Sequence, residues 1–374
     1  MAACARRETC YRRCGKACDN GKIVTPTLQK RRHSTLRLTK IFHALPLLCL
    51  IFLSGKAAGA STSPYLDTRP LYSFNQSPLV QIYGLPALGE ARVLSAGETT
   101  LAMHLQIANN FTGSSNQTES LSLDGETHRL SLAWRQGLGN GTEWGFELPY
   151  LTHNGGFLDS MIDHWHETLG LPNGGRDNTP RNLIDYRYSR NGVDLIRVDH
   201  PVSGLGDLRL SAAKQLAVPE SSSGGIMALR ASLKLPTGND TELLGSGSTD
   251  LALWLSAAST RPSNTWNMYG GGGVLLMSKG DVLPSQQRNQ AAFGTLGFSR
   301  KFFPKVALNA QLDAHSPFYD GTGFRQMSAY SVQGLLGLNW EYQPRRYMEF
   351  SVAEDVMVDT SPDVVFNLSL AFAF

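Results

Sequence analysis

Seven histidines beyond residue 60 are the side chains best suited to act as bases in this chain of 374 residues. In known enzymes that carry a His base and the Ser nucleophile it activates on one β-strand, the two stand two residues apart and so share one face of the strand. None of the seven is followed two residues later by Ser. They are His104, His128, His153, His164, His166, His200 and His315. The simplest hydrolytic site is therefore missing, although a site assembled from different strands stays open.

Other chemical motifs are missing as well. The sequence holds no GxSxG elbow, no phosphate-binding P-loop and no dinucleotide fingerprint. The four glycines at 270–273 indicate instead a place where strand backbones or an internal plug approach closely. We therefore predict that the protein is not an enzyme and binds no cofactor.

A metal site is also not expected. The spacing of Cys4, Cys10, Cys14 and Cys18 looks like a metal site, but no His is arranged with these cysteines. His164 and His166 flank a Trp in a predicted helix, where side chains two residues apart point in different directions. The fifth and last cysteine is at position 49, so the rest of the chain has no thiol. That composition suits an oxidising compartment without disulfides.

The segment 31–61 has the order of a secretory signal peptide. Four basic residues precede an apolar run at 41–54, and Ala58-Gly59-Ala60 follows it as a small-residue cleavage site. We predict that residues 1–60 are a leader removed between Ala60 and Ser61. Residues 1–30 exceed what a signal peptide needs, which indicates an upstream start or a dispensable extension. The alternative is a single N-terminal anchor helix, but the apolar run is short for that.

Charge changes sign at the same place. Residues 1–60 carry twelve Lys and Arg against two Asp and Glu, and the remainder carries twenty-two against twenty-nine. The mature chain is mildly acidic, so a nucleic-acid partner lacks electrostatic support.

From residue 98 onward, apolar and polar residues alternate in segment after segment. In the first, Leu101, Met103 and Leu105 oppose Ala102 and His104. A period of two indicates a strand with one apolar face. The segments lie at 100–107, 129–135, 143–148, 207–212, 227–235, 250–257, 265–277, 294–298, 306–312, 330–342, 348–352 and 364–374. Twelve strands, an even number, are what a barrel with both chain ends on one side requires.

The connections between these strands alternate in length. Short joins fall at 136–142, 219–224, 260–264, 303–304 and 343–346, and long ones at 111–125, 151–204, 236–247, 278–289, 316–327 and 355–362. Outer-membrane barrels have short periplasmic turns and long extracellular loops. We predict an all-β fold: a closed antiparallel transmembrane β-barrel of about twelve strands over 98–374, in lipid of the cell outer membrane.

A soluble β-sandwich or propeller is the competing fold. Several segments here have ten or more residues, enough to cross hydrocarbon at a tilt. Aromatic residues such as Trp144, Tyr150, Trp266 and Trp340 stand near strand ends, where membrane interfaces favour them. Both features favour the membrane barrel.

Two irregular parts flank or interrupt the strands. Residues 61–97 contain four prolines and no sustained period, so they form either a solvated periplasmic tail or a plug in the lumen. The long loop 151–204 has apolar residues at helical spacing from Phe157 to Leu169. We expect a short amphipathic helix there, either packed across the outer mouth or lying on the membrane surface.

Strand parity gives the residues that should face the lumen. The candidates are Arg129, Arg135, Asp207, Arg209, Arg230, Lys234, Asp250, Asp313, His315 and Glu341, with Glu349 in the same set. Buried charges must be paired or hydrated. They therefore form either an ion-pair network that fills a narrow lumen or a wet path for a solute.

The last residue, Phe374, ends the alternating strand VVFNLSLAFAF. A terminal aromatic in such a strand resembles the signal read by the barrel assembly machinery of Gram-negative outer membranes. The resemblance implies that this machinery is a partner and that Phe374 is the assembly signal.

Two further resemblances concern the barrel itself. The segments LKLPTG at 233–238 and GSGSTDL at 245–251 resemble a strand–loop–strand unit of outer-membrane channels for hydrophobic aromatic compounds and fatty acids. Most of the mature chain is similar to an uncharacterised proteobacterial family of outer-membrane proteins, a domain of unknown function. This similarity is carried by NQSP at 75–78, GLPNGGR at 170–176, AQLDAHS at 310–316, ED at 354–355 and SPD at 361–363. It implies a barrel and no particular activity.

Three functions follow from these observations. The first is a narrow channel or transporter for small or hydrophobic solutes, because twelve strands leave a lumen between the packed and open limits. The second is a structural or partner-binding barrel without transport. The third is an outer-membrane enzyme.

Overall fold

The computed structural model describes residues 18–19, 22–23, 66–169, 180–218, 224–260, 266–357 and 360–374. The predicted signal peptide and the cut between Ala60 and Ser61 lie outside the described residues. The chain divides into a unit of residues 1–55 and a unit of residues 56–374. In the first, two short strands pair antiparallel, β1 (Cys18–Asp19) and β2 (Lys22–Ile23). The second unit holds every other described element.

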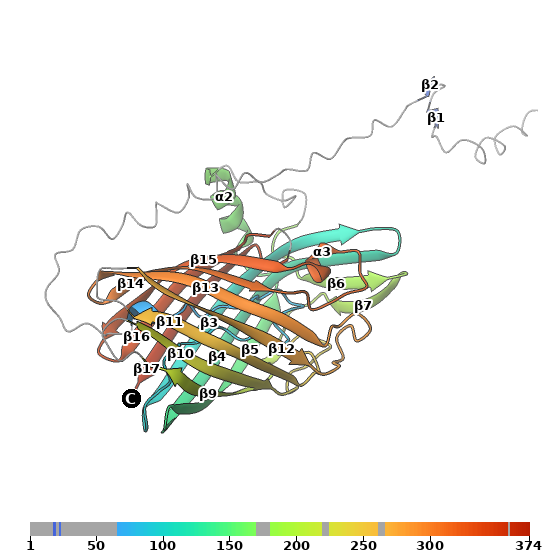
Figure 1. The fold of residues 1–374 in the computed structure, drawn as a ribbon. Coiled ribbons are helices and arrows are strands. Elements are labelled where there is room, and N and C mark those ends of the chain that lie inside the picture. The colour runs from blue at the N-terminus through green and yellow to red at the C-terminus, as the bar shows by residue number, and fades with distance from the viewer. Residues whose placement is uncertain are drawn as a thin grey trace, which may run out of the picture. The chain divides into compact units, whose positions relative to one another are not determined.

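Twelve antiparallel strands of the second unit form a closed barrel (Figure 1). They are β3 (Thr99–Ser115), β4 (Glu119–Gly139), β5 (Thr142–Asn154), β9 (Arg209–Ala217), β10 (Gly224–Lys234), β11 (Asp250–Thr260), β12 (Asn267–Met277), β13 (Gln290–Phe303), β14 (Val306–His315), β15 (Ser331–Gln343), β16 (Arg346–Asp355) and β17 (Val364–Ala373). The last strand pairs with the first, from Val364 opposite Asn109 to Ala373 opposite Thr100. The predicted fold class and all twelve predicted strands are confirmed.

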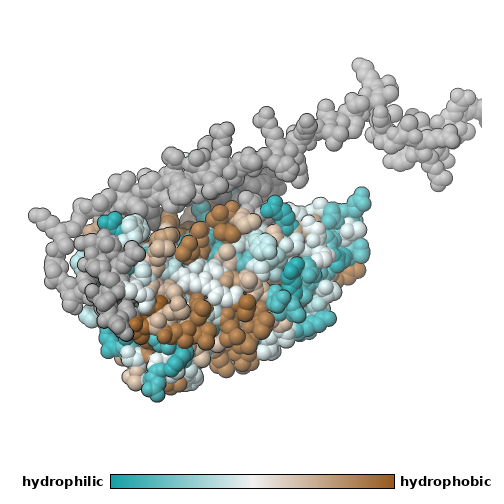
Figure 2. Space-filling model, viewed as in Figure 1, coloured by the Kyte–Doolittle hydropathy of each residue, from teal (hydrophilic) through white to brown (hydrophobic). Residues whose placement is uncertain are grey.

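The outer face of the barrel is an apolar belt. On β11, Leu251, Leu253 and Leu255 are exposed while the residues between them are buried, and a similar alternation of more and less exposed residues runs along the other strands. Figure 2 shows a hydrophobic band across the middle of one face with hydrophilic ends. Lipid cannot hydrogen-bond to an open strand edge, so closure and belt together suit a bilayer. The protein is an integral barrel of the outer membrane.

Short turns gather at one end of the barrel, where the strand start Thr99 also bonds to Phe374. This end is the periplasmic one by the usual asymmetry of such barrels. The long connection predicted at 111–125 is wrong. There β3 and β4 stay paired up to Ser115 and Ser120. The side chains of Leu121 and Leu123 are buried on the inner face of this extension, which stabilises it. A short turn at 116–118 joins them.

The loop 151–204 adds structure beyond the predicted helix. It contains α2 (Asp159–Leu169), β6 (Asp185–Arg190), β7 (Val193–Val198) and β8 (Val202–Leu205). Strand β6 pairs with the upper part of β4 and β7 pairs with β6, so the wall continues above the belt. Strand β8 pairs with the upper end of β5. Two short helices, η3 (Leu66–Thr68) and α3 (Arg325–Ser328), complete the described elements, and no described helix is long and apolar enough to span a membrane.

Candidate functional site

Residues 66–97, which we call the plug, run through the lumen as a bent segment. Its first leg starts near the periplasmic end, where Asn339 donates a hydrogen bond to the carbonyl of Arg69 at 3.0 Å. Its apex, residues 75–84, reaches the extracellular loops, where Tyr319 donates to the carbonyl of Leu79 at 2.8 Å. Its second leg returns to the periplasmic end, where Gly97 donates to the carbonyl of Gly137. The described part of this segment therefore lies against inward-facing side chains of the barrel wall and its extracellular loops.

The charged layer nearest the periplasmic end binds the second leg of the plug. The Glu90 carboxylate lies 3.4 Å from both Arg69 and Arg135. Arg230 donates to the backbone carbonyl of Glu90 through Nε at 2.9 Å. Arg135 and Arg230 also share Glu143, at 3.1 and 2.9 Å. Burial raises the pKa of Glu90, but the guanidinium groups of Arg69, Arg135 and Arg230 outweigh it, so this pKa lies below its usual value.

The middle layer holds the turn from apex to second leg. Arg209 donates to the carbonyls of Leu85 and Tyr83 at 3.1 and 3.0 Å. Arg129 pairs with Glu147 at 3.3 Å. The ring of Phe74 on the first leg lies between these guanidiniums, 4.8 Å from Arg209 and 5.1 Å from Arg129. Both predicted arginines therefore contact the plug directly or through its aromatic ring.

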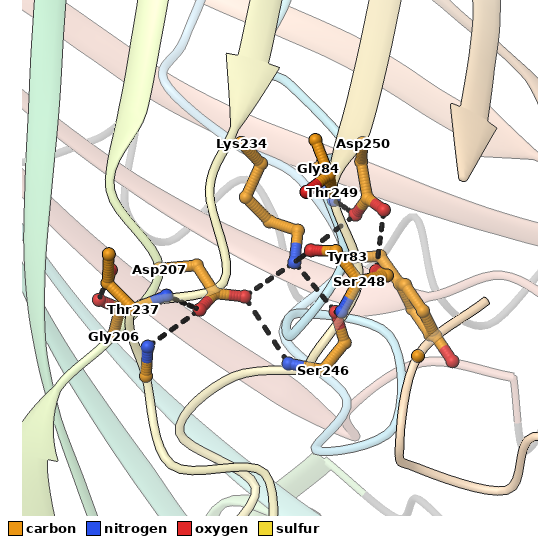
Figure 3. A network of polar contacts seen from close by, with 12 residues as sticks. Tyr83, Gly84, Gly206, Asp207, Lys234, Thr237, Ser246, Ser248, Thr249 and Asp250 are labelled. Atoms are coloured by element: carbon orange, nitrogen blue, oxygen red, sulfur yellow. Dashed lines mark hydrogen bonds and ion pairs between the residues drawn. The ribbon is translucent and has the colours of Figure 1, made fainter. Parts of the chain in front are cut away.

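The uppermost layer is a buried network centred on a lysine (Figure 3). Lys234 Nζ lies 2.5 Å from Asp207 and 3.4 Å from Asp250, and it donates to Ser246 Oγ at 2.6 Å. Asp250 also accepts the backbone N–H of Gly84 in the plug apex, at 2.8 Å. The network thus joins β10, β11, the segment before β9 and an extracellular loop to the plug.

The network explains the LKLPTG and GSGSTDL segments. The first supplies Lys234 and the turn whose Thr237 N–H donates to Asp207 at 3.0 Å. The second supplies Ser246 and Asp250 and also Ser248, which donates to Asp250 at 2.6 Å. These polar residues hold a loop and the plug in place.

The opposite wall contacts the first leg mostly through uncharged groups. Gln311 accepts the N–H of Leu71 at 3.0 Å, and Glu349 accepts the N–H of Tyr72 at 2.8 Å. Asp313 binds Thr295 at 2.7 Å and also Gln311.

Three segments of the family resemblance, NQSP, AQLDAHS and SPD, come together at the apex, while GLPNGGR at 170–176 lies outside the described residues. Asn75, from NQSP, lies 2.9 Å from His315 of AQLDAHS and donates to the carbonyl of Thr360, at 2.9 Å, beside SPD. Glu341 is buried near the periplasmic end and accepts the N–H of Arg345, away from these clusters. Of the predicted lumen residues, Asp207 and Lys234 are linked to the plug through Asp250, and Glu341 lies apart from these clusters.

A cavity of about 180 Å³ lies between the two legs. Its charged and polar lining comes from both legs and from the wall, and its remaining lining is apolar, including Pro86, Phe146 and Trp254. The charged members are Arg69, Glu90, Arg135, Glu147, Arg209, Arg230 and Glu349, joined by His104. The lumen is therefore neither a packed apolar core nor an open pore.

A Ser–His contact lies in this cavity, assembled from different strands. His104 Nδ1 on β3 is 2.8 Å from Ser369 Oγ on β17. The ring of Tyr72 stacks on His104 at 3.6 Å between centroids. A triad needs a carboxylate on the other ring nitrogen, and no such hydrogen bond occurs among the described residues. No cluster of three potential metal ligands occurs in the described ranges either.

Several residues of the site were not on the list of candidates. Glu143 and Glu147 lie on the face of their strand that was predicted to point inward, so strand parity alone could have identified them as lumen residues. Glu90 lies in the aperiodic segment, which gives no signal. Trp254 donates to the carbonyl of Leu88 at 2.7 Å. The interpretation of the glycine run is confirmed at Gly271, where a Cβ would lie 2.8 Å from the Leu88 side chain.

A closed twelve-stranded wall, an apolar belt and an internal plug define an integral outer-membrane β-barrel. The chain belongs to the family described as "Protein of unknown function (DUF3187)", whose model matches residues 46–374. No curated protein matches the chain.

Solved structures share the barrel fold. The COG4313 outer membrane channel from Pseudomonas putida F1 has 16% identity and a TM-score of 0.52, with 76% of this chain and 98% of that chain covered. The CymD monoaromatic hydrocarbon channel has 11% identity and a TM-score of 0.33, with coverage of 75% and 89%. The Pseudomonas putida toluene transporter TodX has 7% identity and a TM-score of 0.32, with coverage of 85% and 98%.

Proposed function

We propose that this protein is a narrow outer-membrane channel in which the plug must shift before a small solute passes. The observation that carries the proposal is the charged cavity of about 180 Å³ between the plug legs. Water can replace hydrogen bonds to polar groups, so a plug seated on such groups is displaced more easily than one in a packed apolar core. The fold shared with the COG4313 channel supports this proposal.

The cavity also bears on the class of solute. Four guanidinium groups, from Arg69, Arg135, Arg209 and Arg230, line it together with three carboxylates and a histidine. These groups pair with one another and with the plug backbone, but an apolar molecule would still remove the charged lining further from water, which is costly even for paired charges. We therefore favour small polar or amphipathic solutes over the purely hydrophobic ones implied by the local sequence resemblance.

A barrel without transport is the second candidate, and one observation favours it. At the extracellular end, the plug apex packs into a buried apolar cluster with the loops, including Tyr83, Leu283, Phe318 and Tyr319. Such a cluster would resist movement of the apex. In that case the extracellular extension would be the functional part.

We also propose that the protein is not an enzyme and that the barrel assembly machinery reads Phe374. The Tyr72 ring that stacks on His104 supports the first statement, because it covers one face of the imidazole. A fluorophosphonate probe should leave Ser369 unlabelled, and labelling abolished by Ser369→Ala would revive the enzymatic function.

A reversible tether tests the channel. A Cβ at Gly84 would lie 2.9 Å from the Cβ of Asp250. A disulfide needs a separation of about 3.5–4.5 Å between the two Cβ atoms, so the plug backbone would move outward slightly when the bond forms. In the Gly84→Cys/Asp250→Cys variant, without the native cysteines, oxidation should abolish solute entry into liposomes and reductant should restore it. The Asp250→Cys single variant is the matched control, because it loses the same carboxylate. Entry that is equal in the oxidised and reduced forms would contradict the proposal.

A further inference from the structure

Helix α2 lies on the outer side of the barrel wall, at the upper edge of the apolar belt. On β4 the exposed residues Leu130 and Leu132 mark the outward face, and Glu126 and His128 share it by parity. Glu126 accepts the backbone N–H groups of Phe157 and Leu158 at 2.7 and 2.5 Å. The start of α2 is therefore fastened to the outside of the wall and not across the mouth.

A second contact fixes the same end of the helix. Asn109, on the outward face of β3, donates to Asp159 at 3.0 Å. Gly156 before the helix has φ +69, and a Cβ there would overlap the Glu126 carboxylate. Only glycine suits both conditions. In Figure 1, α2 projects away from the wall across the direction of the strands.

The two faces of α2 differ. Asp159 and Asp163 lie one turn apart and bind the segment that returns to the wall, through Asn182 N–H at 2.7 Å and Arg181 at 2.8 Å. Met161, two residues from each of these aspartates, lies on the opposite side and is 48% exposed. Phe157, just before the helix, is 61% exposed.

The apolar face points toward the belt. Glu126 holds the N–H of Phe157, while the Phe157 ring packs against His128, whose ring centroid is 6.0 Å away. His128 is one outward position nearer the periplasm than Glu126, and the next outward pair, Leu130 and Tyr150, is exposed. Phe157 and Met161 thus continue the lipid-facing surface outward from the wall.

The geometry points to α2 as an interfacial helix whose Phe157 and Met161 insert into the acyl chains of the outer leaflet. An amphipathic helix lying in the plane of a membrane buries its apolar face at the boundary between headgroups and chains. The occupant is lipid because the exposed face is continuous with the belt that the bilayer already covers. This role is independent of whether the barrel conducts.

The test places a single environment-sensitive fluorophore on the full chain. In a background with the five native cysteines changed to Ser, Met161→Cys is labelled and the protein is reconstituted into phosphatidylcholine vesicles containing acyl-chain-brominated lipid. Leu253→Cys on the belt and Val193→Cys on the extracellular hairpin are the controls, 40% and 59% exposed in the native residues. Phe157→Cys gives a second position on the same face.

Labels at 161 and 157 should be quenched by brominated lipid nearly as strongly as the label at 253, and protected from aqueous iodide. The label at 193 should show the reverse. Iodide quenching at 161 and 157 equal to that at 193, without quenching by lipid, would overturn the proposal. Energy transfer between labels at 161 on different molecules would overturn it too, since the face would then bind a second copy.

Discussion

Lys234 Nζ lies 2.5 Å from Oδ2 of Asp207, and both side chains are almost fully buried at the upper end of the lumen. A buried ion pair adds little when it replaces apolar packing, but removal of one partner leaves an uncompensated charge. The pair therefore adds little stability itself, but wall, loop and plug can assemble correctly only when both partners are in place.

Replacing this lysine should be severely destabilising. Lys234→Met leaves Asp207 and Asp250 facing each other without a cation, and we expect a loss of about 3–5 kcal/mol in the free energy of unfolding. Urea unfolding in detergent, followed by the heat-dependent shift on a gel, measures it. Lys279→Met, on an exposed loop position, should change little. Adding Asp207→Asn and Asp250→Asn to Lys234→Met should recover much of the loss, and failure to do so would refute the electrostatic cause.

Weakening the charged layer nearest the periplasmic end should loosen the plug. Glu90→Gln removes the charge that Arg69 and Arg135 contact, so the second leg loses two ion pairs. We expect the conducting fraction in planar bilayers to rise about tenfold, which corresponds to about 1.4 kcal/mol. Asp320→Asn, with an exposed carboxylate in an extracellular loop, is the control and should leave conductance unchanged. A decrease in conductance for Glu90→Gln would count against this role.

Acid should act through the same carboxylate. The arginines around Glu90 hold its pKa below the usual value despite burial, so the folded state favours the charged form. This stabilisation is present above the pKa of the unfolded chain and is lost as pH falls through the lower pKa of the folded protein. Conductance of the wild type should therefore rise in acid, and the rise should be smaller in Glu90→Gln. Equal acid responses in the two proteins would exclude Glu90 as the titrating group.

A side chain introduced into the glycine run of β12 should destabilise the protein at the position where the plug lies closest. At Gly271 a Cβ would meet the Leu88 side chain and the backbone of β11. We expect Gly271→Val to cost about 1–3 kcal/mol by overpacking. Gly225→Val is the matched control, because no atom lies within 4 Å of its Cβ. Equal thermal stability of the two variants would show that Leu88 does not need this space.

The sequence predicted the wall well and the interior only in part. A period of two fixes which face of a strand is apolar, so Arg209 and Lys234 could be assigned inward from neighbouring residues alone. Their partners could not be assigned, because Glu90 and Gly84 belong to an aperiodic segment whose path depends on the closed barrel. The turn at 116–118 was missed because only Leu121 and Leu123 alternate with polar residues there, and two apolar positions are too short a stripe to mark a strand.

The position of α2 shows the same limit. Helical spacing from Phe157 onward predicted the helix, but two locations remained open. The choice depends on Glu126 and Asn109, which lie on strands distant in sequence and bind the first turn of the helix. Contacts of this kind depend on the register between strands. The hydrophobic periodicity of a single segment does not predict them.

Residues 66–97 are proposed to close a twelve-stranded lumen that would otherwise be open. Single-channel recording of the wild type beside a variant lacking residues 69–94 tests this proposal most directly, with retention of the heat-dependent gel shift as proof of a folded barrel. We predict a mostly closed wild type and a stable, larger conductance in the deletion variant. A folded deletion variant that conducts no more than the wild type would show that residues 69–94 do not close the lumen.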